Sequence, residues 1–128
     1  RELEKTYIAS KLRETMFVNS YLDEIRRVLS GEFELIPELL DPEKIRGLFE
    51  KDCKTIVEAV QKKSVDIESA KRNFFLLKSY VVTQLLTHCE RLRKLAEEKG
   101  IKVTTTLGEE DVNDIAIMID EAEKSLQH

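Results

Sequence analysis

Three polar side chains that could bind a small ligand or transfer a proton follow one edge of a long apolar segment. Tyr80, Gln84 and His88 recur every four residues, so they would share one side of a helix. An imidazole can act as general acid or base near neutral pH, and this makes a ligand pocket or an enzyme active site around His88 one hypothesis. No Ser, Cys or Asp stands where the sequence alone would place a nucleophile beside it. The alternative is structural: these polar side chains would only form hydrogen bonds to one another along a helix–helix contact.

The residues that bind metals in proteins are too few and badly spaced here. Cys53, Cys89 and His88 would supply at most three of the four ligands that zinc requires, and two of them are neighbours that point about 100° apart on one helix. Neither histidine follows a glutamate by three residues, as a di-metal carboxylate bundle requires. We therefore expect no metal, no cofactor and no catalytic residue outside the His88 hypothesis. We expect both cysteines to be small buried apolar side chains.

Basic residues interleaved with aromatic ones favour a second alternative, a nucleic-acid-associated subunit. Aromatic rings beside cations are typical of surfaces that bind single strands. The net charge of −4 opposes this reading, and an acidic segment that follows could neutralise the basic edge. The candidate contacts are Arg72, Lys78, Arg91, Arg93 and Lys94.

The elements that would position all these residues are amphipathic helices. The segment from Ile67 to Lys99 contains no Gly or Pro, and its apolar residues recur every three or four positions. The chain has only 4 Gly and 2 Pro in 128 residues, which favours few and long elements. We expect an all-α fold, a single-domain antiparallel four-helix bundle over residues 1–128. Its two longer helices would cover about 2–30 and 66–99, and its two shorter ones about 42–63 and 107–126.

Local signals place the ends of these helices. Gly31 and Gly100 stand where a left-handed residue would end a helix. Asp41 before Pro42 predicts a helix start, and Ser64 or Asp66 could begin the long helix. Residues 106 and 109, a threonine and a glutamate, have the spacing of a capping box for the last helix.

Apolar residues are more plentiful than four helices need, and this favours a protein-binding role. Residues 15–22 and 79–89 are uncharged helix centres that we expect to face each other, and the connection 31–41 is too apolar for a solvated loop. We expect a non-catalytic interaction or scaffold domain that self-associates or docks to a larger assembly. The connection itself would form a strap or short helical turn across the end of the bundle, or alternatively a docking segment for another protein. The expected contact residues are Ile8, Leu12, Met16, Phe17, Phe33, Leu35, Ile36, Leu39 and Leu40.

The cysteine content and the lengths of the uncharged runs bear on the compartment. Two cysteines are too few for a secreted disulfide scaffold, and no uncharged run exceeds eleven residues, against about 20 needed to span a bilayer. We expect the cytoplasm or another reducing compartment and no membrane partner. Because the sequence begins with Arg1, we also expect it to be part of a longer chain.

Overall fold

The helices begin and end where their own sequence can satisfy the terminal backbone groups. The structure, a computed structural model, describes residues 16–127. Asp41 accepts a hydrogen bond from the Glu43 N–H at 3.0 Å and so begins a helix, and Asp66 does the same for the Ser69 N–H at 2.8 Å. The helices are α2 (Phe17–Leu29), η1 (Pro37–Leu40), α3 (Pro42–Gln61), α4 (Ile67–Tyr80), η2 (Val81–Leu85), α5 (Leu86–Lys99), α6 (Glu109–Lys124) and η3 (Ser125–Gln127).

Glycine ends two of these helices as the sequence predicts. Gly31 and Gly100 have positive φ angles of 87° and 68°, which a residue without a Cβ adopts at little cost. After Gly100 the Ile101 N–H returns to the Ala96 carbonyl at 2.8 Å, the closing bond of a Schellman motif.

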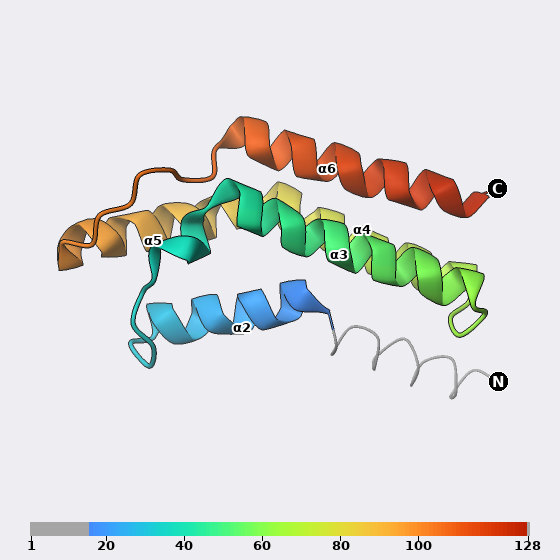
Figure 1. Ribbon diagram of the computed structural model, residues 1–128, viewed down its shortest axis with the longest axis horizontal. Coiled ribbons are helices and arrows are strands. Elements are labelled where there is room, and N and C mark those ends of the chain that lie inside the picture. Colours follow the sequence, from blue (N-terminus) through green and yellow to red (C-terminus); the bar gives the residue numbers. More distant parts are fainter. Residues whose placement is uncertain (1–15, 128) are drawn as a thin grey trace.

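The elements form the predicted antiparallel four-helix bundle. α4, the π-helical turn η2 and α5 make one continuous rod, so the rod counts as one helix of the bundle. Figure 1 shows α2 and the rod running in one direction, and α3 and α6 in the other. α6 packs against α3 and α4 on one side of the bundle, and α2 packs against α3 and α5 on the opposite side. The connection after α2 crosses one end as an extended strap that closes with η1.

Two predicted helix starts differ from the structure. α2 begins at Phe17, because Met16 has an extended backbone (φ −75°, ψ 142°) and no helix continues through it; residues 2–15 lie outside the described part. α6 begins at Glu109 after an N-cap at Gly108, where the Asp111 carboxylate accepts the Gly108 N–H at 2.9 Å. The capping box predicted at Thr106 and Glu109 is therefore wrong, since the carboxylate that closes the first turn is Asp111.

The core is a continuous apolar layer that runs the length of the bundle. Its fully buried members include Phe49 of α3, Phe74 of α4 and Ile115 of α6. The two uncharged centres meet where the Tyr21 hydroxyl of α2 lies 3.8 Å from the Cys89 sulfur of α5, whereas η2, the middle of 79–89, packs against α6. The outer side of 79–89 is nevertheless open to solvent at Val82, Thr83 and Gln84.

Lys63 has a left-handed backbone conformation, which is unfavourable for a residue with a side chain. Its φ is 61°, and its N–H donates to the Val60 carbonyl at 3.0 Å at the end of α3. A Cβ in the left-handed region costs about 1 kcal/mol, which glycine avoids. We expect Lys63→Gly to raise the free energy of unfolding by roughly that amount in a urea titration. The neighbouring Lys62→Gly, at φ −83°, should instead lower it.

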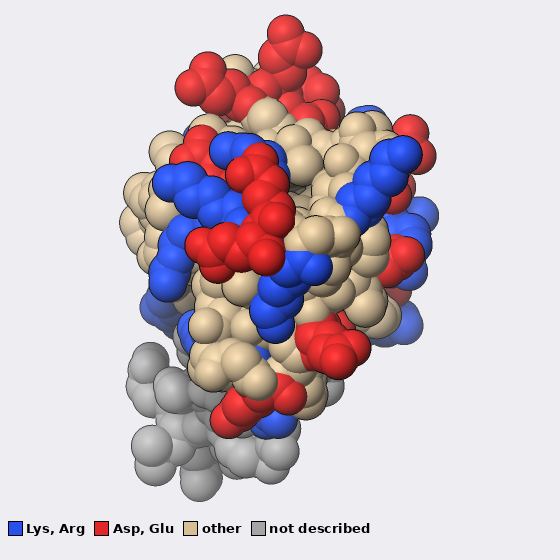
Figure 2. Space-filling view, turned by 90° about the vertical axis from the view of Figure 1, so that its left-hand side faces the viewer, with Lys and Arg blue, Asp and Glu red and all other residues tan. Residues whose placement is uncertain are grey.

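Charges of both signs are mixed over the end of the bundle where the strap lies. Figure 2 shows Lys and Arg interspersed with Asp and Glu on this face, and acidic side chains gathered at the top, the side on which α6 lies in Figure 1. This face is not a basic surface.

Candidate functional site

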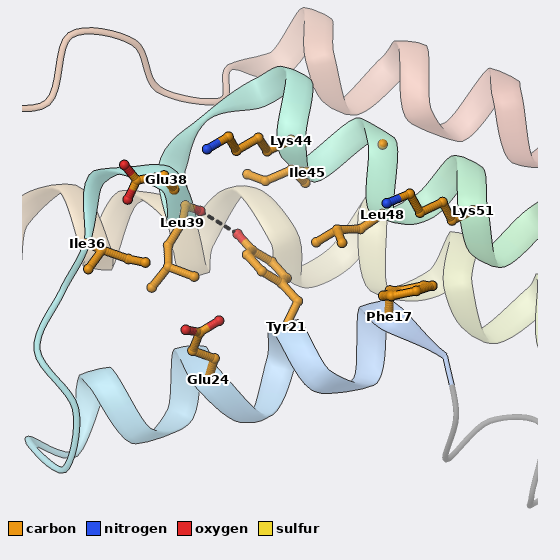
Figure 3. Close-up of a pocket in the computed structure, with 11 residues that line it drawn as sticks. Phe17, Tyr21, Glu24, Ile36, Glu38, Leu39, Lys44, Ile45, Leu48 and Lys51 are labelled. Carbon is orange, nitrogen blue, oxygen red and sulfur yellow. Dashed lines mark hydrogen bonds between the residues drawn. The ribbon is translucent and has the colours of Figure 1, made fainter.

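A pocket of about 410 Å³ opens between α2, the strap and α3. Figure 3 shows that its lining side chains come from these three elements and surround Tyr21. Apolar atoms make up most of its wall, and charged groups stand at its edges. We call this site the α2–α3 pocket; its lining residues are Phe17, Tyr21, Glu24, Ile36, Glu38, Leu39, Lys44, Ile45, Gly47, Leu48 and Lys51.

The floor of the pocket is fixed by a buried tyrosine. The Tyr21 hydroxyl donates a hydrogen bond to the Leu39 carbonyl at 2.8 Å, so it ties α2 to η1 (Figure 3). Burial, and after it the neighbouring Cys89 thiol, raises the pKa of Tyr21 far above the ordinary range. This phenol therefore stays protonated, and its single proton is already engaged.

Phe17 is held at the mouth of the pocket from two sides. Its backbone N–H and that of Val18 each donate to the Asp52 carboxylate at 2.8 Å, so a side chain of α3 caps the first turn of α2. The Lys51 ammonium lies 5.2 Å from the centroid of the Phe17 ring, within the range of a cation–π contact. The ring itself remains 47% exposed. α3 thus fixes the position of an apolar ring that residues 16–127 leave about half exposed.

Gly47 leaves the α3 side of the pocket open. A Cβ built on it would meet no other atom within 4 Å, so nothing in the described chain requires a glycine there. Glycine inside a helix costs about 1 kcal/mol relative to alanine. The pocket therefore includes a piece of bare helix backbone that a bound group could approach closely.

Charged groups divide the rim into a basic and an acidic edge. Lys44 and Lys51 extend from α3, whereas Glu24 of α2 and Glu38 of η1 stand along the other edges (Figure 3). A bound segment would meet opposite charges on its two flanks.

The structure separates the predicted contact residues into an exposed and a buried set. Phe17, Phe33 and Ile36 are each close to half exposed, and Phe33 also lies beneath the Arg27 guanidinium at 5.3 Å. Met16, Leu35 and Leu40 belong to the core of the chain itself and line no part of the pocket, whereas Leu39 is buried but contributes to the pocket wall. Ile8 and Leu12 lie outside the described residues. Of the predicted contact residues that the structure describes, only Phe17, Phe33 and Ile36 are exposed enough to form a contact surface.

Sequence reasoning missed most of the residues that line the α2–α3 pocket. No motif or spacing in the sequence distinguishes Tyr21 from other apolar positions, or the rim charges of the pocket from other charged residues; these are Glu24, Glu38, Lys44 and Lys51. The one available signal was a glycine in the middle of a predicted helix, because such a residue lowers helix stability and needs a reason.

The π-turn brings together two of the three polar residues of the His88 hypothesis. In a regular helix residues eight apart differ by roughly 80° in direction, and the wider turn of η2 removes much of this difference. The Tyr80 hydroxyl and His88 Nδ1 are 2.9 Å apart. Burial, followed by Arg91 and Arg26, lowers the pKa of His88, so the imidazole is neutral at pH 7. Gln84 is exposed to solvent instead of joining the pair.

The basic residues of the nucleic-acid hypothesis do not form one free surface. Lys78 pairs with Asp120 at 2.8 Å and Arg93 with Glu97 at 2.7 Å, so two of the five cations already have acidic partners. Arg72 donates to the Ser69 hydroxyl at 3.4 Å, while Arg91 and Lys94 are exposed. Nothing in this arrangement favours nucleic acid over protein.

Among residues 16–127, no three His, Cys, Asp or Glu side chains gather in a way that could hold a metal ion. Over the same range, no helix combines the length and apolar character needed to cross a membrane. Cys53 and Cys89 are buried free thiols.

Comparison with known proteins places relatives in an archaeon. A family model described as AF0941-like matches residues 15–126. An uncharacterised protein of Archaeoglobus fulgidus is 40% identical over 113 residues, which cover 87% of this chain and 99% of the relative. The solved structure of the "predicted coding region AF0941" from Archaeoglobus fulgidus has a TM-score of 0.71 at 39% identity, and the match covers 86% of this chain and 97% of the other.

Proposed function

The chain belongs to the AF0941-like family, and we propose that it is a non-catalytic protein-interaction domain whose α2–α3 pocket binds an apolar side chain of a partner protein. The observation that carries this proposal is the open helix backbone at Gly47 inside an apolar pocket. A glycine that weakens α3, at a position where a Cβ would meet nothing else in the described chain, is explained if a bound group fills the space above it.

The exposed apolar residues extend beyond the pocket and favour a polypeptide over a small molecule. Ile36 belongs to the pocket wall, but Phe33 stands outside it on the same strap, and both are 45% exposed. Exposed apolar side chains on a shared segment are typical of protein contact sites. A small ligand that filled the pocket would leave Phe33 uncovered.

The rim charges define the chemistry of the partner segment. Lys44 and Lys51 would attract acidic side chains, and Glu24 and Glu38 basic ones. The partner is therefore an amphipathic helix with a Leu, Met or Phe anchor, acidic residues on one flank and basic residues on the other.

The polar groups of the pocket support binding and not chemistry. Tyr21 is the one hydroxyl in its lining, and its proton is engaged by the Leu39 carbonyl. A phenol with a raised pKa is a poor base and a poor nucleophile. The two buried free thiols are consistent with a reducing compartment, which we keep as part of the proposal.

A selection from helical peptides displayed on phage tests the pocket directly. The full chain is the target, and a Gly47→Leu variant serves for counter-selection, because its side chain would occupy the space above α3. We expect enriched peptides with an apolar anchor between opposite charges, and at least about tenfold weaker binding to Gly47→Leu. The same variant should unfold at a higher temperature than the wild type, since it removes a glycine from a helix interior.

Lys94→Leu is the matched control, since it adds the same side chain to an exposed position of α5 outside the pocket. It should bind the selected peptides as the wild type does. Selected peptides that bind Gly47→Leu and the wild type equally would rule out the pocket, and so would a selection that yields no anchored sequence.

A further inference from the structure

A second apolar surface lies on the outer side of α4, η2 and α6, away from the α2–α3 pocket. Its members are the three most exposed large apolar side chains of the described residues: Phe75 at 68%, Val82 at 60% and Ile117 at 55%. The salt bridge between Lys78 and Asp120, 2.8 Å long, joins the two helices at this surface. We call it the α4–α6 face.

Helix direction brings Val82 and Ile117 to neighbouring positions. α4 and α6 are antiparallel (Figure 1), and Lys78 is level with Asp120. Val82 stands about one turn after Lys78 and Ile117 about one turn before Asp120, so both lie on the same side of the salt bridge. Phe75 stands about one turn on the other side. Apolar side chains therefore flank a central ion pair along the seam between the two helices.

The two helices that form this face carry opposite charges. In the register set by Lys78 and Asp120, the part of α6 beside α4 has three acidic side chains and one lysine, whereas α4 has three basic side chains and one acidic; the other four acids of α6 lie beside η2 and the start of α5. A two-fold axis parallel to the helices would place α4 of one copy over α6 of the other. This arrangement sets basic against acidic helices at both contacts. The alternative arrangement, with α6 over α6, would oppose two strongly acidic helices.

We propose that a second copy of this chain covers the α4–α6 face, with Val82 of each copy packed on Ile117 of the other. The charge pattern makes the face complementary to itself. Residues 81–87 of η2 and α5, which lie beside the face, contain no charged side chain, so a dimer would bury no charge there. This inference does not depend on the α2–α3 pocket, which lies on the other side of the bundle beside α2.

Paired charge variants test both the dimer and its geometry. Sedimentation velocity of the full chain over a range of concentrations should show a dimer. Val82→Glu alone and Ile117→Lys alone would each bury two uncompensated charges in the dimer. We expect each variant to raise the dissociation constant of the dimer at least about tenfold. An equimolar mixture of the two variants should recover a dimer, because one contact becomes Glu to Lys and the other keeps Ile117 on Val82.

Leu76→Glu is the control, since Leu76 is 45% exposed on the same helix but points about 100° away from Phe75. It should leave the dimer intact. A wild-type chain that stays monomeric would overturn the proposal, as would dimers that survive both single variants. A mixture that stays monomeric would overturn the placement of α4 over α6.

Discussion

Replacing Asp52 by alanine is expected to lower the free energy of unfolding by about 3 kcal/mol. Asp52 is completely buried in α3, and its two carboxylate oxygens accept the N–H groups of Phe17 and Val18 at 2.8 Å each. Without the carboxylate these two donors at the start of α2 have no partner, and burial prevents water from fully replacing it. Chemical denaturation followed by circular dichroism measures the change.

Asp52→Asn isolates the contribution of the second oxygen. An amide oxygen can accept one of the two N–H groups, but its NH₂ group would face the other donor, so we expect a loss of about 2 kcal/mol. Asp41→Asn is the matched control, because Asp41 caps α3 at an exposed local site where asparagine caps equally well. A loss of similar size in both variants would contradict a special role for Asp52.

The pH dependence of the Asp52 variant has a defined sign. Burial raises the pKa of the Asp52 carboxyl above its ordinary value of 3.8, although the bonds from Val18 and Phe17 oppose the shift. The folded chain therefore holds a proton at Asp52 at pH values where the unfolded chain has released it. Acidification through the raised pKa toward 3.8 stabilises the folded wild type at this site, whereas Asp52→Asn does not titrate there. The stability difference between the two proteins should grow as the pH falls through this window.

This cap also explains which helix ends the sequence could predict. Asp41, Asp66 and Gly100 act on backbone groups within a few residues of themselves, so their local spacing was sufficient. The start of α2 depends on a carboxylate 35 residues away from Phe17, and no local pattern contains it. The π-turn could not be predicted either, because the apolar residues of 67–99 recur at a regular helical spacing that does not show where one turn widens.

The candidate site was predictable only in outline. The strap was expected to be apolar and to contact either the bundle or a partner, and it does contact the bundle through Leu35, Leu39 and Leu40. In a helix the period of 3.6 residues tells which side chains share a face, but an irregular strap has no period. Phe33 and Ile36 therefore had the same weight as their buried neighbours, and only the fold could separate them.

The second large expected effect concerns Leu40 and Ile36, two aliphatic residues of the strap that differ in burial. Leu40 is fully buried, and Leu40→Ala should lower the free energy of unfolding by about 3 kcal/mol, because it leaves a cavity where η1 meets the core. Ile36 is 45% exposed at the pocket edge, and Ile36→Ala should cost less than about 1 kcal/mol. Urea titrations of both variants give the comparison.

The same two variants divide stability from binding. Under the proposed function, Ile36→Ala should weaken binding of the selected peptides at least about tenfold while the chain remains as folded as the wild type. Leu40→Ala should bind normally once its folded fraction is taken into account, because the Leu40 side chain points from the strap into the core and lines no part of the pocket. If Leu40→Ala costs little stability, the strap is not anchored in the core as the structure has it. If Ile36→Ala binds the peptides unchanged, the strap contributes nothing to the contact, and the pocket is bounded in function by α2 and α3 alone.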